Sequence, residues 1–421
     1  MTAQHLPVAA PLDDPITHAG DPLEAAREHI ANAALRETVE RRVGLELEFH
    51  LVDLAEPSRR PSWEAVQALA TGLPPMPSGS SVTVEPGGQL ELSTPPTPDL
   101  SSSVAALRAD RQVLRDGLAA AGYGAAPLGA DPARKVERIN PSGRYVAMER
   151  HFAALGCAGP GRAMMSATAA LQVNLDAGPA KRWPERLGLI RDLGPVLVAA
   201  SACSPYLAGR ASGWHSMRQQ TWHGIDHSRS DPVGGDDPAA AWASYALAAP
   251  VMLVRDGARA RPVTRRVPFS AWLTGAASIG RRPTMADLDY HLTTLFPPIR
   301  PRGYIEIRCL DALPDRWWPA LAALTVTLID DDIAADRAAD ICRPVRDAWL
   351  AAAHDGLADT TLAAAVTACV ELAAERCVPE LKAEVEAYAE LIRSGRTPGD
   401  EVRDRALEHG PLRVLEEEGR A

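Results

Sequence analysis

Glutamate side chains two residues apart give this chain a candidate site for cations. Glu46 and Glu48 alternate with leucine, and a β-strand has a side-chain period of two, so both carboxylates lie on one strand face. Three further stretches show the same alternation of polar residues with Leu, Ile or Val. We therefore predict a sheet with one charged face. The four stretches are residues 44–49, 84–92, 170–176 and 304–308.

Most polar residues of these stretches are carboxylates and amides. Carboxylates on one face repel each other unless cations neutralise them, and Mg²⁺ takes oxygen ligands that it often shares with phosphates. The pattern therefore suggests Mg²⁺ and a nucleotide more than zinc. Ordinary solvent-facing strands are the alternative, but Arg308 is the only basic residue on the four faces. Residues that share a face are Glu46 and Glu48; Glu85, Gln89 and Glu91; Gln172, Asn174 and Asp176; and Glu306 and Arg308.

Other motifs narrow the chemistry. The sequence has no GxxxxGK[ST] and no well-placed GxGxxG, so any ATP is bound without a P-loop or a dinucleotide fold. There is no HExxH, and the six scattered cysteines predict reduced, mostly buried thiols rather than a zinc site. His50 shares parity with Glu48, but we expect a structural role for it. Residues 213–229 hold two Trp, three His and two Arg; Arg suits a carboxylate or phosphate, and a solvated loop is the alternative.

The composition is that of a globular protein with a sizeable core. Hydrophobic residues make up 46% of the 421 residues, and the net charge of -10 argues against a general nucleic-acid binder. No apolar run approaches the roughly 20 residues that span a bilayer, and residues 1–20 lack the order of a signal peptide. We predict a cytoplasmic protein with a disordered leader over residues 1–20 and neither a nucleic-acid nor a membrane partner.

The rest of the sequence predicts one large α+β domain over residues 21–421. Its polar strands are irregularly spaced and include a hairpin at 82–93, which favours an antiparallel or mixed sheet over a doubly wound one. Residues 317–421 predict a helical C-terminal layer. Helices are expected at 22–42, 62–73, 100–121, 144–155, 180–202, 239–249, 285–295, within 317–393 and at 401–418; further strands at 43–52, 164–176, 251–254 and 303–310; and irregular segments at 156–163 and 205–238.

In their order and spacing, these segments resemble the glutamate–cysteine ligase family, in particular its plant and proteobacterial branch. Within the family, the likeness is greatest to the actinobacterial enzymes that make γ-glutamylcysteine for ergothioneine synthesis. The resemblance implies a glutamine-synthetase-like fold, with a curved, mainly antiparallel sheet whose concave face holds Mg²⁺ and ATP. It implies that ATP phosphorylates the γ-carboxylate of glutamate and that the cysteine amine attacks the acyl phosphate. The matching segments contain Glu46 and Glu48, residues 85–91, residues 143–145, residues 172–176, residues 218–229, Phe296-Pro297 and residues 304–308.

The resemblance also implies a role for each matching residue. Arg218 and Arg308 would be catalytic, binding a substrate carboxylate or the transferring phosphoryl group. Gln172 stands where some relatives have a metal-binding His, so its metal contact would be direct or through water. His151-Phe152 stands where the family often has a Tyr-Met pair, so the resemblance does not assign the residues of the cysteine pocket. The implied Mg²⁺ ligands are Glu46, Glu48, Glu91, Glu306, Glu85 and Gln172, and the implied substrate-binding residues are Arg218, Tyr145, Met148, Trp222, Asn174 and Gln89.

Three other functions stay open at this point. One is a carboxylate–amine ligase of the same fold with a different amine acceptor. Another is a non-catalytic relative that binds Mg-ATP, and the third is a metal-dependent hydrolase that needs no ATP. The predicted partners are the small molecules glutamate, cysteine and ATP. The sequence does not decide between a monomer and a dimer.

Overall fold

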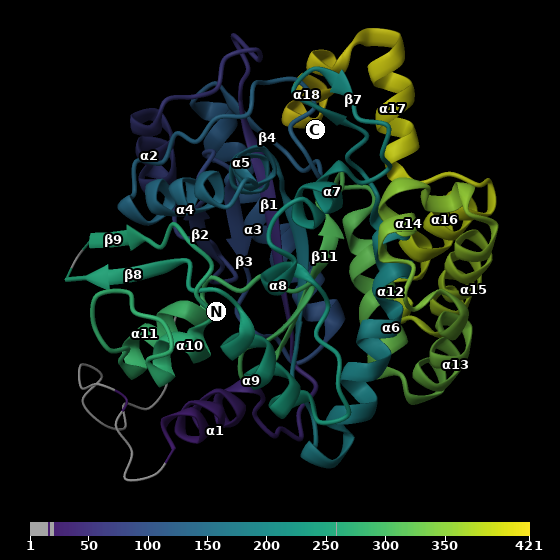
Figure 1. Cartoon of the computed structure of the whole chain (residues 1–421). Coiled ribbons are helices and arrows are strands. Elements are labelled where there is room, and N and C mark those ends of the chain that lie inside the picture. The colour runs from purple at the N-terminus through teal and green to yellow at the C-terminus, as the bar shows by residue number, and fades with distance from the viewer. Residues whose placement is uncertain (1–15, 17–20, 258) are drawn as a thin grey trace.

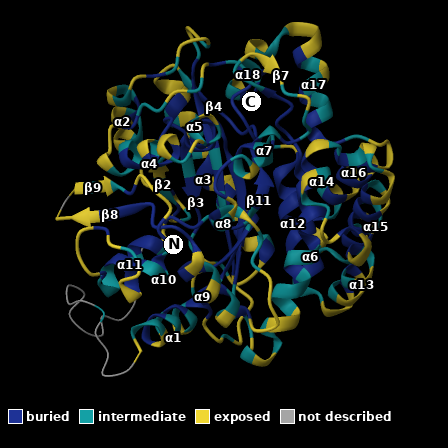
Figure 2. Ribbon diagram, in the orientation of Figure 1, coloured by how far each residue is buried: buried dark blue, intermediate teal, exposed yellow. Residues whose placement is uncertain are grey.

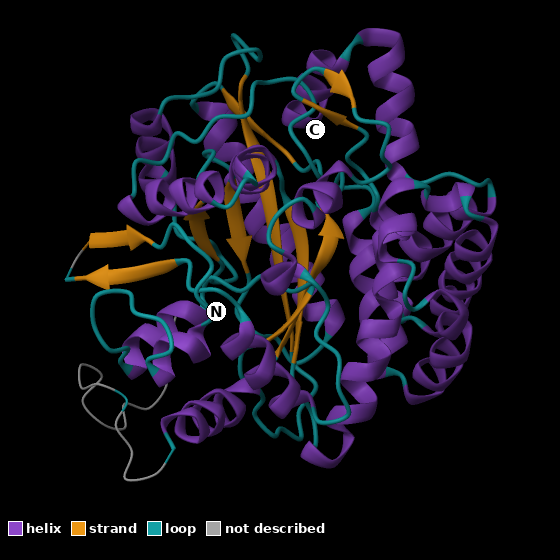
Figure 3. Cartoon of the chain, in the orientation of Figure 1, coloured by secondary structure: helices purple, strands orange, loops and turns teal. Residues whose placement is uncertain are grey.

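A seven-stranded antiparallel sheet runs through the computed structural model, which describes Ile16 and residues 21–257 and 259–421 (Figure 1). The strand order is β10–β11–β5–β1–β3–β2, with β4 also paired to β1, and every pairing is antiparallel. Figure 3 shows the strands between helices on both sides. The strands are β1 Val43–Asp53, β2 Ser81–Val84, β3 Leu90–Ser93, β4 Tyr123–Ala126, β5 Ala170–Leu175, β10 Ile299–Pro301 and β11 Ile305–Asp311.

The four polar stretches lie on neighbouring strands, β11, β5, β1 and β3. Glu48 lies opposite Glu91 across β1 and β3, and Glu306 lies opposite Asn174 across β11 and β5. Alternate residues such as Leu45 are fully buried on the other face. Figure 2 shows that the sheet and the helices beside it form the buried centre of the molecule. The predicted α+β class with an antiparallel sheet and one polar face is confirmed.

The C-terminal part of the chain forms a layer of helices beside the sheet, as predicted. α6 (Trp183–Ser201) and α12 pack together, and α6 also contacts β11 while α12 contacts β5. The predicted terminal helix at 401–418 is instead two helices, because Gly410 has a φ of 84° and breaks the run. α18 packs on β4. The C-terminal helices are α12 Trp318–Asp330, α13 Asp332–Cys342, α14 Trp349–His354, α15 Thr360–Arg376, α16 Lys382–Arg393, α17 Pro398–His409 and α18 Pro411–Arg420.

The capping residues predicted where helices begin better than the sequence predicted how long the helices are. Asp21 accepts a hydrogen bond from the amide of Leu23 and begins α1, which ends at Ala34 rather than at the predicted residue 42. Thr284 and Asp287 form a capping box at the start of α11. The other helices of this part are α1 Pro22–Ala34, α2 Trp63–Gly72, α3 Leu100–Ala120, α4 Gly143–Ala154, α9 Pro238–Ala248, α10 Phe269–Thr274 and α11 Met285–Leu292.

Three predicted segments differ from the structure. Residues 156–163 are not a link and 164–176 are not one strand, because α5 (Ala158–Ala167) runs across the boundary before β5. An apolar run of this length has no periodicity that separates a helix from a buried strand. The stretch 205–238 is not irregular throughout, although its helices are too short to show a helical repeat. It contains β6 Tyr206–Leu207, β7 Arg210–Ala211, α7 Met217–His223 and α8 His227–Ser230.

A few features complete the description. The predicted strand at 251–254 is part of a hairpin of β8 (Leu253–Asp256) and β9 (Arg259–Pro262). Across the described ranges, no helix combines the length and apolar character needed to cross a membrane. Apart from Ile16, the predicted leader at 1–20 lies outside the described residues. The division into a leader and one catalytic domain stays a prediction.

Candidate active site

The polar face of the sheet borders a cavity that opens to solvent, and the volume of about 970 Å³ includes the solvent at its mouth. Side chains of α4, α5, α7 and the segment before β11 line the rest of it. Of the residues predicted from the sequence, Asn174 alone is absent from the lining, although it bonds a lining residue. The predicted residues that line the cavity are Glu46, Glu48, Glu85, Gln89, Glu91, Tyr145, Met148, Gln172, Arg218, Trp222, Glu306 and Arg308.

One half of the cavity is anionic. Burial, together with the charges of Glu91 and Glu306, raises the pKa of Glu46 to about 7. Burial and the neighbouring Glu91 also raise the pKa of Glu85 well above its usual range. Burial raises the pKa values of Glu48 and Glu91 as well. These carboxylates are crowded beyond what nearby protein cations neutralise, so the electrostatics of this half favour a bound cation.

Two amide side chains hold the carboxylates in place. Gln172 Nε2 donates to Glu48 Oε1 at 3.3 Å and to Glu91 Oε2 at 3.4 Å. Asn174 Nδ2 donates to Glu46 Oε1 at 2.8 Å. The Gln172 oxygen does not face these carboxylates, because it accepts a hydrogen bond from Arg308 instead. In this arrangement the Gln172 amide nitrogen orients two carboxylates, and its oxygen is bonded to Arg308.

The other half is cationic and surrounds Glu306. Arg300 forms two hydrogen bonds to that carboxylate, at 2.6 and 3.1 Å, and Arg302 and Arg308 approach it at 3.3 and 3.2 Å. Although burial alone would raise the pKa of Glu306, the three guanidinium groups hold it well below its usual range. Arg300 and Arg302 line the cavity but were not predicted from the sequence. Their alternation with Pro301 is the one sequence signal that could have placed both on the same strand face.

The donor set fits a hard divalent cation. It consists of carboxylate oxygens that face one cavity and repel each other, which are the ligands Mg²⁺ prefers. Among the residues that the structure describes, no three His, Cys, Asp or Glu side chains are yet gathered closely enough to enclose a metal. Glu85 fits well, since no hydrogen bond to its carboxylate is found within the described ranges, whereas Glu306 is already shared by three guanidinium groups. The metal roles stay a prediction.

The turn between β2 and β3 places Glu85 at the edge of the cavity. The amide of Glu85 donates to the carbonyl oxygen of Gln89 at 2.8 Å, and Arg60 Nη1 donates to the carbonyl oxygen of Gly87 at 3.0 Å. A Cβ atom on Gly87 would lie 2.1 Å from the carbonyl oxygen of Ser166, so only glycine fits there. The turn is therefore packed directly against the end of α5.

Apolar side chains form another part of the cavity lining, which we call the methionine wall. Met148 of α4 and Met164 and Met165 of α5 line the cavity, together with Tyr145 and Trp222. Burial, with a smaller effect from the charge of Glu85, raises the pKa of Tyr145 to about 12, so its hydroxyl stays protonated. Sequence reasoning missed Met164 and Met165 because it assigned them to a strand.

The departure at His151-Phe152 does not reach the cavity. Both side chains are fully buried, and neither lines it. His151 Nδ1 is bonded to the carbonyl oxygen of Val263 at 2.6 Å, and Phe152 packs against Gly161. The predicted structural role of His50 agrees with its position, since it is buried and bonded to the carbonyl oxygen of Leu128.

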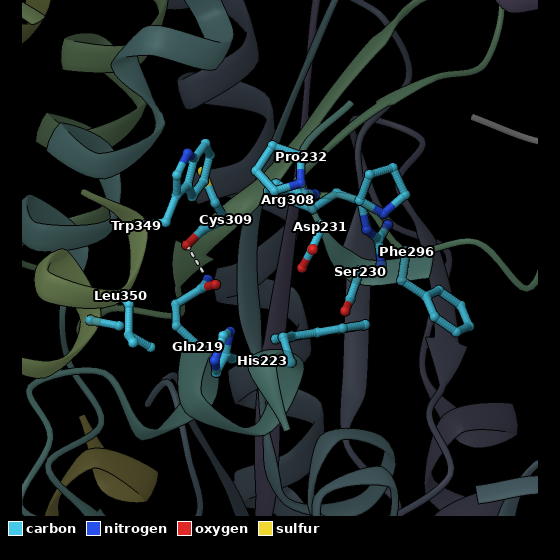
Figure 4. Close-up of a pocket in the computed structure, with 14 residues that line it drawn as sticks. Gln219, His223, Ser230, Asp231, Pro232, Phe296, Arg308, Cys309, Trp349 and Leu350 are labelled. Carbon is cyan, nitrogen blue, oxygen red and sulfur yellow. Dashed lines mark hydrogen bonds between the residues drawn. The ribbon is translucent and has the colours of Figure 1, made fainter. Parts of the chain in front are cut away.

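A second cavity, of about 600 Å³ with the solvent at its mouth included, shares part of its lining with the first (Figure 4). Trp222, Phe296 and Arg308 border both. In Figure 4, Gln219 points to the Cys309 carbonyl oxygen, to which its amide donates at 2.6 Å. Arg308 thus stands where the two cavities meet.

Comparisons with known proteins identify the family of this chain. The model of the glutamate–cysteine ligase family 2 (GCS2) matches residues 42–418. The glutamate–cysteine ligase EgtA of Mycolicibacterium smegmatis is 50% identical over 398 residues, which are 94% of each chain. Its counterpart in Mycobacterium tuberculosis is 48% identical over 414 residues, covering 97% of this chain and 95% of the relative. A chloroplastic glutamate–cysteine ligase of Medicago truncatula is 30% identical over 269 residues, 62% of this chain and 52% of the relative.

A solved structure shares the fold. The glutamate–cysteine ligase of Francisella tularensis, determined in complex with AMP, has a TM-score of 0.58 and 15% identity, over 91% of this chain and 88% of that chain. An antiparallel sheet whose polar face sets carboxylates opposite guanidinium groups defines a site for cations together with anionic substrates. The chain belongs to the glutamate–cysteine ligase family 2.

Proposed function

We propose that this protein joins the γ-carboxylate of glutamate to the amine of cysteine, forming γ-glutamylcysteine and converting ATP to ADP and phosphate. The observation that carries the proposal is the near full-length likeness to two ligases of that name, at 48 and 50% identity. A carboxylate is a poor acyl donor, and transfer of a phosphoryl group from ATP gives it a good leaving group. The amine then attacks the γ-glutamyl phosphate, and phosphate departs.

The carboxylates of β1, β3 and the hairpin turn would hold Mg²⁺. Mg²⁺ would neutralise the phosphates of ATP and the charge that develops during transfer. The raised pKa values of these carboxylates support the assignment, since a divalent cation would relieve their mutual repulsion. Glu306 is the weakest of the proposed ligands because of its guanidinium partners. The proposed ligands are Glu46, Glu48, Glu85 and Glu91, with Glu306 and Gln172 as lesser candidates.

The two catalytic arginines have separate tasks in this proposal. Arg308 lies between Gln172 and Glu306 and would neutralise the transferring phosphoryl group. Arg218 is buried and lines the cavity, so its guanidinium would bind a substrate carboxylate. Neither group needs to act as a nucleophile, because the chemistry depends on positioning and charge neutralisation.

The acceptor would lie against the methionine wall. Met148, Met164 and Met165 offer a polarizable apolar surface that suits a thiol side chain. Trp222 and Tyr145 would close this side and keep water from the acyl phosphate. We therefore assign cysteine selectivity to this wall, which contains Tyr145, Met148 and Trp222, three of the residues predicted to bind substrate. Gln89 bonds the Thr168 carbonyl oxygen at 2.8 Å and would support the pocket from behind.

The proposal extends to cellular context. The likeness to two mycobacterial ligases named EgtA supports the proposal that the γ-glutamylcysteine formed is used for ergothioneine synthesis. Neighbouring genes for that pathway would be consistent with this proposal. We propose a cytoplasmic protein, since ATP is available there and all six cysteines are unpaired thiols in the structure. No nucleic-acid or membrane partner is proposed, and either a monomer or a dimer is compatible with the site.

One assay separates the candidate functions. Purified protein receives ATP, Mg²⁺, glutamate and a panel of amines, and phosphate and dipeptide are measured. The proposal predicts the fastest turnover with cysteine, complete dependence on ATP and loss of activity with a chelator. Equal turnover with a thiol-free amine would indicate the ligase with another acceptor. Product without ATP would indicate a hydrolase, and Mg-ATP binding without turnover a non-catalytic relative.

A further inference from the structure

A β-bulge in β11 changes which side chains face the cavity side of the sheet. Ile307 pairs with Val173 and Leu310 with Leu171, so Arg308 and Cys309 both lie opposite Gln172. Beyond the bulge, Asp311 lies opposite Ala170, which shares its face with Asn174, the partner of Glu306. Asp311 is therefore on the same face as Glu306. Simple alternation along the sequence would have placed it on the opposite face.

Asp311 is a fully buried carboxylate with a complete set of hydrogen-bond donors. Oδ2 accepts from Ser204 Oγ at 2.6 Å and from the amide of Cys203 at 3.0 Å, and Oδ1 accepts from Ser216 Oγ at 2.8 Å. The carboxylate lies against Gly129, where an added Cβ would be 2.5 Å from Oδ2. Asp311 does not line the cavity, so it lies beneath the substrate-facing layer.

The same two serines hold the first turn of α7. Ser204 Oγ accepts from the amide of Arg218 at 3.1 Å, and Ser216 Oγ caps the helix by accepting from the amide of Gln219 at 3.2 Å. Asp311 thus fixes, through two hydroxyl groups, the segment of backbone that carries Arg218. Since the serines donate to Asp311, their lone pairs remain available to the helix.

The charge of Asp311 also faces the guanidinium of Arg218. Arg218 Nη1 lies 3.9 Å from Asp311 Oδ1, and Nη2 donates to the carbonyl oxygen of Arg308 at 2.7 Å. Both side chains are at most 3% exposed, so the two opposite charges compensate each other in a poorly solvated region. The other carboxylate that acts on Arg218 is Glu48, which belongs to the proposed metal site.

We propose that Asp311 is a positioning residue that fixes Arg218 for the substrate carboxylate, through its charge and through Ser204 and Ser216. The inference rests on the proposed function only in taking Arg218 as the group that binds glutamate. Asp311 would thus influence the affinity for glutamate, but not the affinity for ATP, without lining the cavity itself. Loss of the charge should therefore affect the affinity for glutamate more than the affinity for the nucleotide.

The test is Asp311→Asn in the full chain, with steady-state kinetics. Asparagine keeps the shape and one acceptor oxygen, so it can accept from only one of the two serines, and it removes the charge that faces Arg218. KM for glutamate should rise at least about tenfold, KM for Mg-ATP should change by less than about twofold, and kcat should fall less than KM rises. The matched control is Asp110→Asn. Asp110 is fully buried and accepts two backbone hydrogen bonds, from Ser78 and Ser80, away from the cavity.

The outcomes decide between positioning and general stability. If Asp311→Asn lowers the melting temperature as Asp110→Asn does but leaves KM for glutamate unchanged, the proposal is wrong. If Asp311→Asn does not fold, Ser204→Ala replaces it: a rise in KM for glutamate supports the proposal, and an unchanged value overturns it. If the wild-type protein turns over no amine, glutamate binding by calorimetry gives the same comparison, so failure of the proposed reaction remains distinguishable.

Discussion

Arg308 donates a hydrogen bond to the side-chain oxygen of Gln172, with 2.6 Å between Nη1 and Oε1. This bond fixes the orientation of the amide, because the Gln172 nitrogen then points toward Glu48 and Glu91. The cationic and anionic halves of the cavity are thus joined through one neutral side chain.

Gln172→Glu tests this arrangement. The new carboxylate would keep the contact with Arg308, but it would replace two amide donors by a charge beside Glu48 and Glu91. We expect a lower melting temperature without divalent cations and a larger upward shift on adding Mg²⁺ than in the wild type, because a bound cation stabilises the folded state. Thermal melts in Mg²⁺ and in NaCl of equal ionic strength measure the difference. An equal Mg²⁺ shift in both proteins would count against Gln172 as part of the cation site.

Glu48→Gln tests the proposed metal assignment. kcat/KM should fall at least about 100-fold, which corresponds to about 2.7 kcal/mol of transition-state stabilisation. The melting temperature without Mg²⁺ should be unchanged or higher, because burial raises the pKa of Glu48 and its charged form is unfavourable there. Glu64→Gln on the exposed face of α2 is the control and should retain activity. Turnover by Glu48→Gln within about threefold of wild type would remove Glu48 from the metal site.

Met148→Ala tests the acceptor wall. Met148 is buried and lines the cavity, so its truncation should raise KM for cysteine about tenfold with little change in KM for glutamate. The change should also lower the free energy of unfolding by roughly 2–5 kcal/mol. Met76→Ala, at a buried methionine outside the cavity, should lose comparable stability but keep both KM values. A parallel rise in KM for both substrates would argue against a specific cysteine wall.

His151 should make the folded state sensitive to acid. Burial, assisted by the charge of Arg229, lowers the pKa of His151 to about 4 from a usual value of 6.5. Its contribution to stability is therefore complete above about pH 6.5 and is lost as the pH falls toward 4, because the unfolded chain takes up the proton first. The difference amounts to about 3 kcal/mol.

Urea unfolding of His151→Asn across this pH range measures the effect. The variant should be less stable than wild type near neutral pH, since a smaller side chain leaves a cavity, but its stability should fall less steeply on acidification. His409→Asn, at an exposed histidine, should follow the wild-type curve. An identical slope for His151→Asn and wild type would show that His151 does not titrate as its burial implies.

Period-two patterning predicted much of the site, because it holds along β1, β3, β5 and the part of β11 before its bulge. Glu46, Glu48 and Gln172 face one cavity for that reason, although their strands are far apart in sequence. The pattern fails where backbone geometry changes parity, as at the bulge that turns Asp311 to the cavity side. It also fails for Met164, because an apolar segment beside a strand carries no sign of where a helix ends.

The close approach of Gly87 to the Ser166 carbonyl oxygen links two parts of the cavity to which we assign different ligands in the proposed function. The turn with Glu85 belongs to the proposed cation half, and α5 carries Met164 and Met165 of the acceptor wall. A residue larger than glycine at position 87 would require the end of α5 to retreat. Substitutions in α5 that give a new acceptor preference would therefore be restricted by the turn that carries Glu85. Lineages in which α5 changes should carry compensating substitutions in this turn.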